Sequence, residues 1–142
     1  MNQKAYDKAI QLLNMRMHAS GELAQKLKTK GFANSDIREV TKKLEDLRFL
    51  DDEHFARIFV ENMKAYKDWG YFGLKAKLIK KYLPSDIIER TLERFYPPEV
   101  ELAVAERLVK KLKNRGRGGY QKLARSLASK GFRNEIIGKV LN

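Results

Sequence analysis

The sequence predicts an all-α protein, an elongated and curved array of three tandem three-helix repeats with about nine helices. Apolar side chains recur three and four residues apart along most of the 142 residues, and no alternation of apolar and polar residues is long enough for a β-strand. The chain also resembles itself at a fixed offset, which is typical of helical repeat proteins. We therefore expect repeats at residues 1–50, 51–96 and 97–142.

The internal similarity is strongest between the first and last repeats. The positions that recur at an offset of 100 residues are, in the first copy, Leu23, Ala24, Leu27, Lys30, Gly31, Phe32, Asn34, Ile37 and Val40. A weaker middle copy follows the first at an offset of 51 residues, through Leu74, Leu78, Lys81, Leu83, Ile88 and Phe95. Units of roughly fifty residues match the length of known helical repeats.

Three helices are expected in the first repeat. The first has an apolar stripe of Tyr6, Ala9, Ile10, Leu13 and Met17. Ser20 is expected to cap the second helix, Glu22 to Lys30, which ends at Gly31 because glycine tolerates the left-handed conformation after a helix. Asn34 or Ser35 is expected to cap the third, whose buried stripe is Ile37, Val40, Leu44 and Leu47.

Acidic residues open the second repeat. Asp51 is expected as the N-cap, with Leu50 and Phe55 forming a hydrophobic staple. Three consecutive acids also occur at metal and acid–base sites, but capping and the positive end of the helix dipole explain all three. The helix continues through a stripe of Phe55, Ile58, Phe59 and Met63.

An aromatic connection separates this helix from the next. Trp69, Tyr71 and Phe72 are expected to close the connection onto the helices, with recognition of a partner as the alternative. The following helix, Leu74 to Leu83, is predicted to bury Leu74, Leu78, Ile79 and Tyr82. Leu83-Pro84-Ser85-Asp86 then turns the chain into a helix that ends near Phe95.

The third repeat begins at a pair of prolines. Pro98 suits a first helical turn, and the long helix that follows has a stripe of Val100, Val104, Leu108 and Leu112. The loop from Arg115 to Gly119 is glycine-rich and basic, but it has neither the Lys-Ser/Thr ending nor the preceding strand of a phosphate-binding loop. Core positions predicted for the middle helices and their turns are Leu23, Leu27, Phe32, Leu78, Leu123, Leu127 and Phe132.

Composition excludes several classes of protein. The chain has no cysteine, which excludes disulfides and thiol catalysis, and its two histidines, His18 and His54, form neither a metal cluster nor a catalytic pair. We expect no enzymatic activity, no catalytic residues, no metal and no cofactor. No apolar run has the length of a membrane span, so we expect a cytoplasmic monomer that does not bind membranes.

Positive charge is concentrated in the last repeat. The formal net charge of the chain is +12, yet residues 51–100 hold nine basic and nine acidic side chains, whereas residues 101–142 hold eleven basic and three acidic ones. No acidic residue occurs between Arg107 and Asn134. A stretch of one sign favours a polyanionic partner, either nucleic acid or an acidic protein surface, over the alternative of ordinary solvated helix faces.

Several short motifs together resemble the RecX family of bacterial recombination regulators. They are Leu23-x3-Leu27-x3-Gly31-Phe32, Phe49-Leu50-Asp51-Asp52-x2-Phe55-Ala56, Gly70-Tyr71-x-Gly73, and the closing Leu123-x3-Leu127-x2-Lys130-Gly131-Phe132. The resemblance covers essentially the whole chain. Arg48 and Tyr82 depart from it because the family commonly has glycine at both positions, and Leu74 stands where proline is common.

The resemblance implies a partner and an effect. RecX-like proteins bind the RecA recombinase filament on DNA, restrain its ATPase, strand-exchange and co-protease activities, and so regulate DNA repair and the SOS response. We expect the contact residues on the outward sides of the second and third repeats, at Lys77, Lys80, Lys81, Arg115, Arg117, Lys122, Arg125 and Lys130. The alternative is a non-sequence-specific DNA- or RNA-binding protein that acts independently of RecA.

Overall fold

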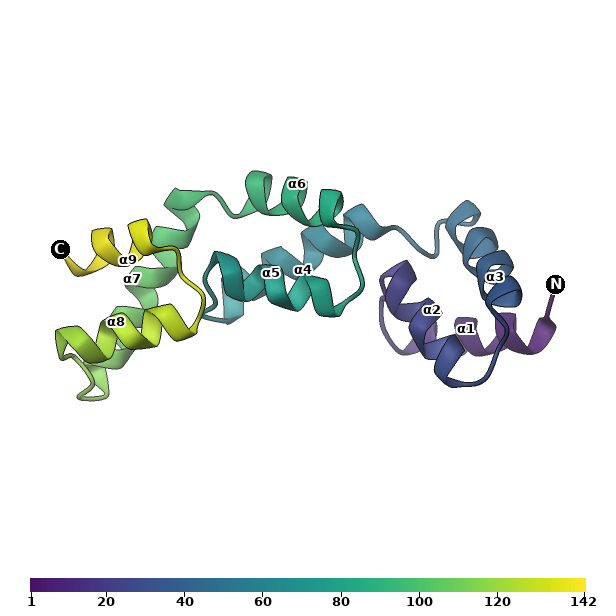
Figure 1. Cartoon of the computed structure of the whole chain (residues 1–142), viewed down its shortest axis with the longest axis horizontal. Coiled ribbons are helices and arrows are strands. Elements are labelled where there is room, and N and C mark those ends of the chain that lie inside the picture. The colour runs from purple at the N-terminus through teal and green to yellow at the C-terminus, as the bar shows by residue number, and fades with distance from the viewer.

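The computed structural model describes residues 1–142 and contains nine α-helices and no β-strand. The helices are α1 (Gln3–Met15), α2 (Ser20–Thr29), α3 (Asn34–Asp46), α4 (Asp52–Tyr66), α5 (Tyr71–Lys80), α6 (Ser85–Phe95), α7 (Pro98–Asn114), α8 (Tyr120–Ser129) and α9 (Asn134–Leu141). Figure 1 shows them as an elongated row with the two termini at opposite ends. The prediction of an all-α array of three-helix repeats is confirmed.

A left-handed residue follows five of the helices. Gly31, Gly116 and Gly131 adopt φ values of +95°, +73° and +82° after α2, α7 and α8. Arg48 and Tyr82 adopt φ values of +63° and +60° in the turns after α3 and α5, without the glycine that would make this conformation free of strain. The two departures from the RecX pattern therefore keep the backbone conformation that glycine favours.

The expected helix caps were partly wrong. Asp51 caps α4, where its Oδ1 accepts a hydrogen bond from the His54 amide at 3.1 Å. Ser20 and Asn34 are instead the first residues of α2 and α3, and the N-caps are Ala19 and Ala33, which have no capping side chain. Ser20 is not free to cap because its amide and hydroxyl both donate to the carboxylate of Asp52, at 2.7 and 2.6 Å.

Some residues predicted to be buried are exposed. Helix α1 ends at Met15, so Met17 lies beyond it and is 39% exposed, and Leu47 is the C-cap after α3 with 44% exposure. Helix α5 ends at Lys80, three residues before the predicted end. Ile79 lies on its solvent side, and the side chain of Tyr82, in the turn after the helix, is also exposed. The predicted core residues of the repeats are buried, except that Phe32 is half-buried.

The hydrophobic cores divide the molecule into two bodies. One core of eight buried residues joins α1, α2 and α3, whereas a core of nineteen buried residues extends through α4 to α9 and includes one residue of the first repeat, Ala19. Leu50 belongs to the first core and Phe55 to the second, so the predicted staple between them is wrong. The second and third repeats therefore share one interior, and the first repeat has its own.

Candidate partner-binding surface and the two joints that position it

We call the contacts between the first and second repeats the first joint, and those between the second and third repeats the second joint. At the second joint the start of α5 lies against the turn between α8 and α9. The amides of Gly70 and Phe72 donate to the carbonyls of Lys130 and Gly131, at 2.9 and 2.8 Å. A β-carbon at Gly70 would overlap the backbone of Phe132, and one at Gly131 would overlap the amide nitrogen of Gly73. The second joint therefore depends on direct backbone contact.

A buried carboxylate completes the second joint. Glu101, in α7, is fully buried, and its Oε2 accepts from the amides of Tyr71 and Arg133 at 2.9 and 3.0 Å. Its Oε1 accepts from the Arg133 Nε at 2.6 Å. The charge of Glu101 is thus paired and hydrogen-bonded, which a buried carboxylate requires. One side chain of the third repeat holds the first residue of α5 and the turn before α9.

The only tryptophan of the chain lies between two lysines at the second joint. The ammonium groups of Lys77 and Lys130 lie 4.2 and 4.3 Å from the centre of the Trp69 ring. Such cation–π contacts stabilise partly buried sites by roughly 0.5 to 2 kcal/mol each. Trp69 and Tyr71 are half-buried at the joint, as expected, whereas Phe72 is 55% exposed.

An ion-paired aspartate connects α7 to the segment before α5. Asp68 accepts from Arg107 Nε at 2.9 Å and from Lys111 Nζ at 2.8 Å. Partial burial raises the pKa of Asp68, but the hydrogen bonds and positive charges of Lys111 and Arg107 outweigh burial and hold that pKa below its usual value. Two cations of the basic third repeat are therefore paired at the joint, where Asp68 offsets one of their two positive charges.

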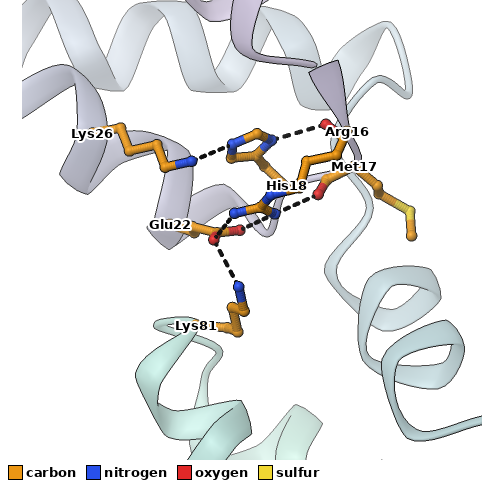
Figure 2. Close-up of polar contacts among 6 residues, drawn as sticks. All are labelled: Arg16, Met17, His18, Glu22, Lys26 and Lys81. Atoms are coloured by element: carbon orange, nitrogen blue, oxygen red, sulfur yellow. Dashed lines mark hydrogen bonds and ion pairs between the residues drawn. The ribbon is translucent and has the colours of Figure 1, made fainter. Parts of the chain in front are cut away.

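The first joint combines a close backbone contact with polar side-chain contacts. A β-carbon at Gly21 would overlap the carbonyl oxygen of Tyr82. Figure 2 shows the carboxylate of Glu22, in α2, between Arg16 of its own repeat and Lys81 of the second repeat. Arg16 donates to both carboxylate oxygens, and Lys81 Nζ donates to Oε2 at 3.1 Å. Burial raises the pKa of Glu22, but these two cations overcome that effect and lower the pKa to about 2. Glu22 is therefore ionised at neutral pH and attracts Lys81 across the joint.

His18 supports α2 beside the first joint. Its Nδ1 lies 2.9 Å from the Arg16 carbonyl and its Nε2 lies 2.8 Å from the Lys26 ammonium, as Figure 2 shows. Because a carbonyl only accepts and an ammonium only donates, the ring is neutral with its proton on Nδ1. Burial lowers the pKa of His18 and the charges of Arg16 and Lys26 add to this, against the hydrogen bond to the Arg16 carbonyl. His18 therefore has a structural partner on each ring nitrogen.

Three of the predicted contact residues have partners inside the molecule. Lys77 and Lys130 lie on Trp69, and Lys81 is paired with Glu22. The other five are exposed and make no ion pair; these free cations are Lys80, Arg115, Arg117, Lys122 and Arg125. They lie at the end of α5, in the loop between α7 and α8, and on α8.

The structure contains neither a cluster of metal-binding side chains nor a helix suited to span a membrane. No group of three or more His, Cys, Asp or Glu side chains is placed to hold a metal ion. None of the nine helices combines the length and apolar character that a membrane span requires.

Comparison with known proteins identifies the family. Residues 5–44 match the model of the first three-helix domain of RecX, and residues 51–92 match the model of the second three-helix domain. The chain is 37% identical over 139 residues to the regulatory protein RecX of Caldanaerobacter subterraneus subsp. tengcongensis, which covers 98% of this chain and 70% of that relative. It is 32% identical to the regulatory protein RecX of Prosthecochloris aestuarii, over 98% of this chain and 92% of the relative.

The chain belongs to the RecX family. The crystal structure of RecX from Lactobacillus salivarius has a TM-score of 0.88 to this fold at 28% identity, covering 98% of this chain and 93% of that one. The relatives are named regulatory proteins, and this family and the all-helical fold point to a regulator that is not an enzyme.

Sequence reasoning missed the acidic residues that organise this RecX-family chain. Glu22 and Asp68 each bind a basic residue from another repeat, and Glu101 accepts a hydrogen bond from the Tyr71 amide of the second repeat while pairing with Arg133 of its own. One signal was present, because Glu101 is one of only three acids among residues 101–142. The pairing itself depends on how the repeats pack, which helical periodicity does not specify.

Proposed function

We propose that this chain binds the RecA recombinase filament on DNA and restrains its ATPase, recombinase and co-protease activities. The observation that supports this most strongly is the match to RecX regulators along the chain. The free cations of the second and third repeats fit such a partner, because no ion pair within the molecule compensates their positive charge.

The free cations of the larger body are the proposed contact surface. We do not include three of the predicted residues in this contact surface, because each already has a partner at a joint. They are Lys77, Lys81 and Lys130. Arg115 and Arg117 lie in the loop after α7 and extend the basic surface beyond the helices. Loops of this kind contact phosphates and carboxylates without the ordering of a rigid pocket.

A matched pair of charge reversals tests the site. We expect Lys80→Glu, Arg115→Glu, Arg117→Glu and Arg125→Glu together to abolish the inhibition of RecA ATPase activity on single-stranded DNA. The control reverses four exposed and unpaired cations of the first repeat, Lys4, Lys28, Arg38 and Lys43, which changes the net charge equally. Helicity and melting temperature should be unchanged in both. Inhibition by the first variant at the wild-type level would contradict the assignment.

A nucleic-acid binder that acts without RecA is the second candidate, favoured by the net charge of +12. It predicts that affinity for DNA alone falls with salt, at a slope of about −0.9 per neutralised phosphate for a duplex, and that RecA does not alter binding. Titration of a labelled oligonucleotide at several salt concentrations, with and without RecA, separates the two candidates. Binding that requires RecA favours the first.

A further inference from the structure

Helix α5 has an apolar stripe on its outer side as well as its inner side. Leu74 and Leu78 face the core and are fully buried. Phe72 and Ile79 are each 55% exposed and lie two helical turns apart, with exposed Ala76 between them. We call Phe72, Ala76 and Ile79 the α5 outer stripe. Two of its residues, Phe72 and Ile79, are therefore large apolar side chains that do not fill the core of the protein.

The repeat itself does not require this stripe. The residues at the same positions of α2 are Gly21, Gln25 and Lys28, and those of α8 are Gln121, Arg125 and Ala128. All three helices have the same role in their repeats, with two buried leucines facing the core. The apolar outer side is thus particular to the middle repeat. Stability of the fold does not account for it.

The second joint fixes the position of the stripe. The Phe72 ring packs edge-on against the Tyr71 ring at 5.4 Å, and the Arg133 guanidinium lies 4.3 Å from the centre of the Tyr71 ring. The Phe72 amide is held by the Gly131 carbonyl. An anchor that is already ordered loses little conformational entropy on binding. The α5 outer stripe is therefore presented by the shared core of the second and third repeats.

Lysines border the stripe and indicate what covers it. Lys75 and Lys80 are its neighbours on the helix surface, and neither forms an ion pair in the structure. A second copy of the chain would place lysines against lysines, at a net charge of +12 per copy. A nucleic acid would pair with the lysines but would offer an aliphatic side chain such as Ile79 no apolar surface to bury.

From these observations we propose that the α5 outer stripe docks into an apolar groove, bordered by carboxylates, on a protein partner. This rests on the proposed function, in which that partner is the RecA filament. Phe72 and Ile79 fill the groove, and Lys75 and Lys80 pair with the bordering acids. Apolar anchors in the centre and charges at the rim are the arrangement of specific protein interfaces. The free cations of α8 and its preceding loop are then left for DNA or acidic surface beside the groove.

The double variant Phe72→Gln, Ile79→Gln tests the proposal. We expect its affinity for RecA filaments assembled on single-stranded DNA to fall at least tenfold, measured by co-sedimentation and by ATPase inhibition. Its affinity for the same DNA without RecA, measured by fluorescence anisotropy, should stay within twofold of wild type. The control Met15→Gln, Tyr66→Gln removes two apolar residues that are 76% and 79% exposed elsewhere, and it should bind filaments normally.

The single variant Ala76→Gln tests the stripe without risk to folding. It adds a bulky polar side chain at an exposed position of the stripe, and glutamine is a good helix former. Circular dichroism and Trp69 emission should be unchanged in all variants. If the double variant binds RecA filaments within twofold of the wild-type affinity, the proposal is overturned. The proposal is also overturned if the double variant loses affinity for DNA alone as much as it loses affinity for filaments. It is overturned as well if the wild-type chain sediments as a dimer and the double variant as a monomer. A wild-type chain that neither binds nor inhibits RecA filaments overturns the proposed function itself.

Discussion

The two joints of this RecX-family chain connect equivalent parts of the repeats by different means. The second joint has a shared hydrophobic core, backbone hydrogen bonds and a fully buried carboxylate. At the first joint, Ala19 is the only first-repeat residue in the larger core, and Gly21 lies close to the backbone of Tyr82. The other contacts there are polar, chiefly Glu22 with Lys81 and Ser20 with Asp52. Tandem repeats that read alike in sequence therefore differ in how firmly they are held together.

The residues proposed to contact a partner all lie on the larger body, which is formed by the second and third repeats. The free cations and the α5 outer stripe all belong to the second and third repeats, which share a core. Their relative positions are thus set by packing. The first repeat is attached mainly through polar contacts that water and salt compete with, together with Ala19 and the backbone contact at Gly21, so we expect that changing its angle requires less free energy.

The largest expected effect compares glycines at the same repeat position. Alanine at Gly31 or Gly131 adopts an unfavourable positive φ, which costs about 1 kcal/mol. A β-carbon at Gly131 also overlaps the backbone of α5, whereas none of the surrounding atoms lies within 4 Å of one at Gly31. We expect Gly131→Ala to lower the free energy of unfolding by about 3 to 4 kcal/mol in urea titrations. Equal losses in the two variants would show that the second joint is not tightly packed.

Removing the charge of Glu101 should break the second joint. Glu101→Gln leaves Arg133 without its buried counter-ion, which costs about 3 kcal/mol. The nearby exposed Glu99→Gln serves as the control, for which less than about 0.5 kcal/mol is expected. Urea unfolding followed by Trp69 emission measures both. A similar midpoint for the two variants would contradict the role assigned to Glu101.

Acid should weaken the region around the first joint through Glu22. Its pKa is lowered to about 2 in the folded chain, so its stabilisation is complete above the unfolded value, near 4.5, and is lost as the pH falls from there toward 2. After discounting for solvent screening, this stabilisation is on the order of 2 kcal/mol. Glu22→Gln should therefore show that loss at pH 7 and a flatter acid dependence than wild type, measured by thermal melting across pH 2 to 6.

Exposed and unpaired Glu45 provides the control for that measurement. Glu45→Gln should follow the wild-type acid dependence. If Glu22→Gln also retains the full wild-type slope between pH 4.5 and 2, other carboxylates cause the acid sensitivity.

The smallest expected effect concerns the angle between the two bodies. Lys81→Gln removes one ion pair at the first joint, and Lys77→Gln removes one cation–π contact at the second; each costs about 1 kcal/mol or less. Only Lys81→Gln should broaden the distance distribution between spin labels at Lys43→Cys and Lys139→Cys. The chain has no native cysteine, so labelling is specific. Equal broadening in both variants would remove the distinction between the joints.

Helix periodicity and repeat spacing were sufficient to predict most of the fold. The apolar stripes predicted the helices, and Gly31 predicted where α2 ends. The errors occurred where neighbouring repeats meet. Ser20 binds Asp52 instead of capping its helix, and Ile79 faces solvent although it lies next to the buried Leu78. Local patterns do not distinguish a core-facing apolar residue from an outward-facing one at the edge of a stripe.

The sequence by itself determined the helical class, the repeat, the excess of positive charge and the family, because each is a property of residue type and spacing along the chain. Only the tertiary structure decided which lysines are free. Glu22 neutralises Lys81, and Trp69 engages Lys77 and Lys130, because packing brings together residues from different repeats. The same packing joins two repeats into one body and leaves Phe72 and Ile79 exposed on its surface.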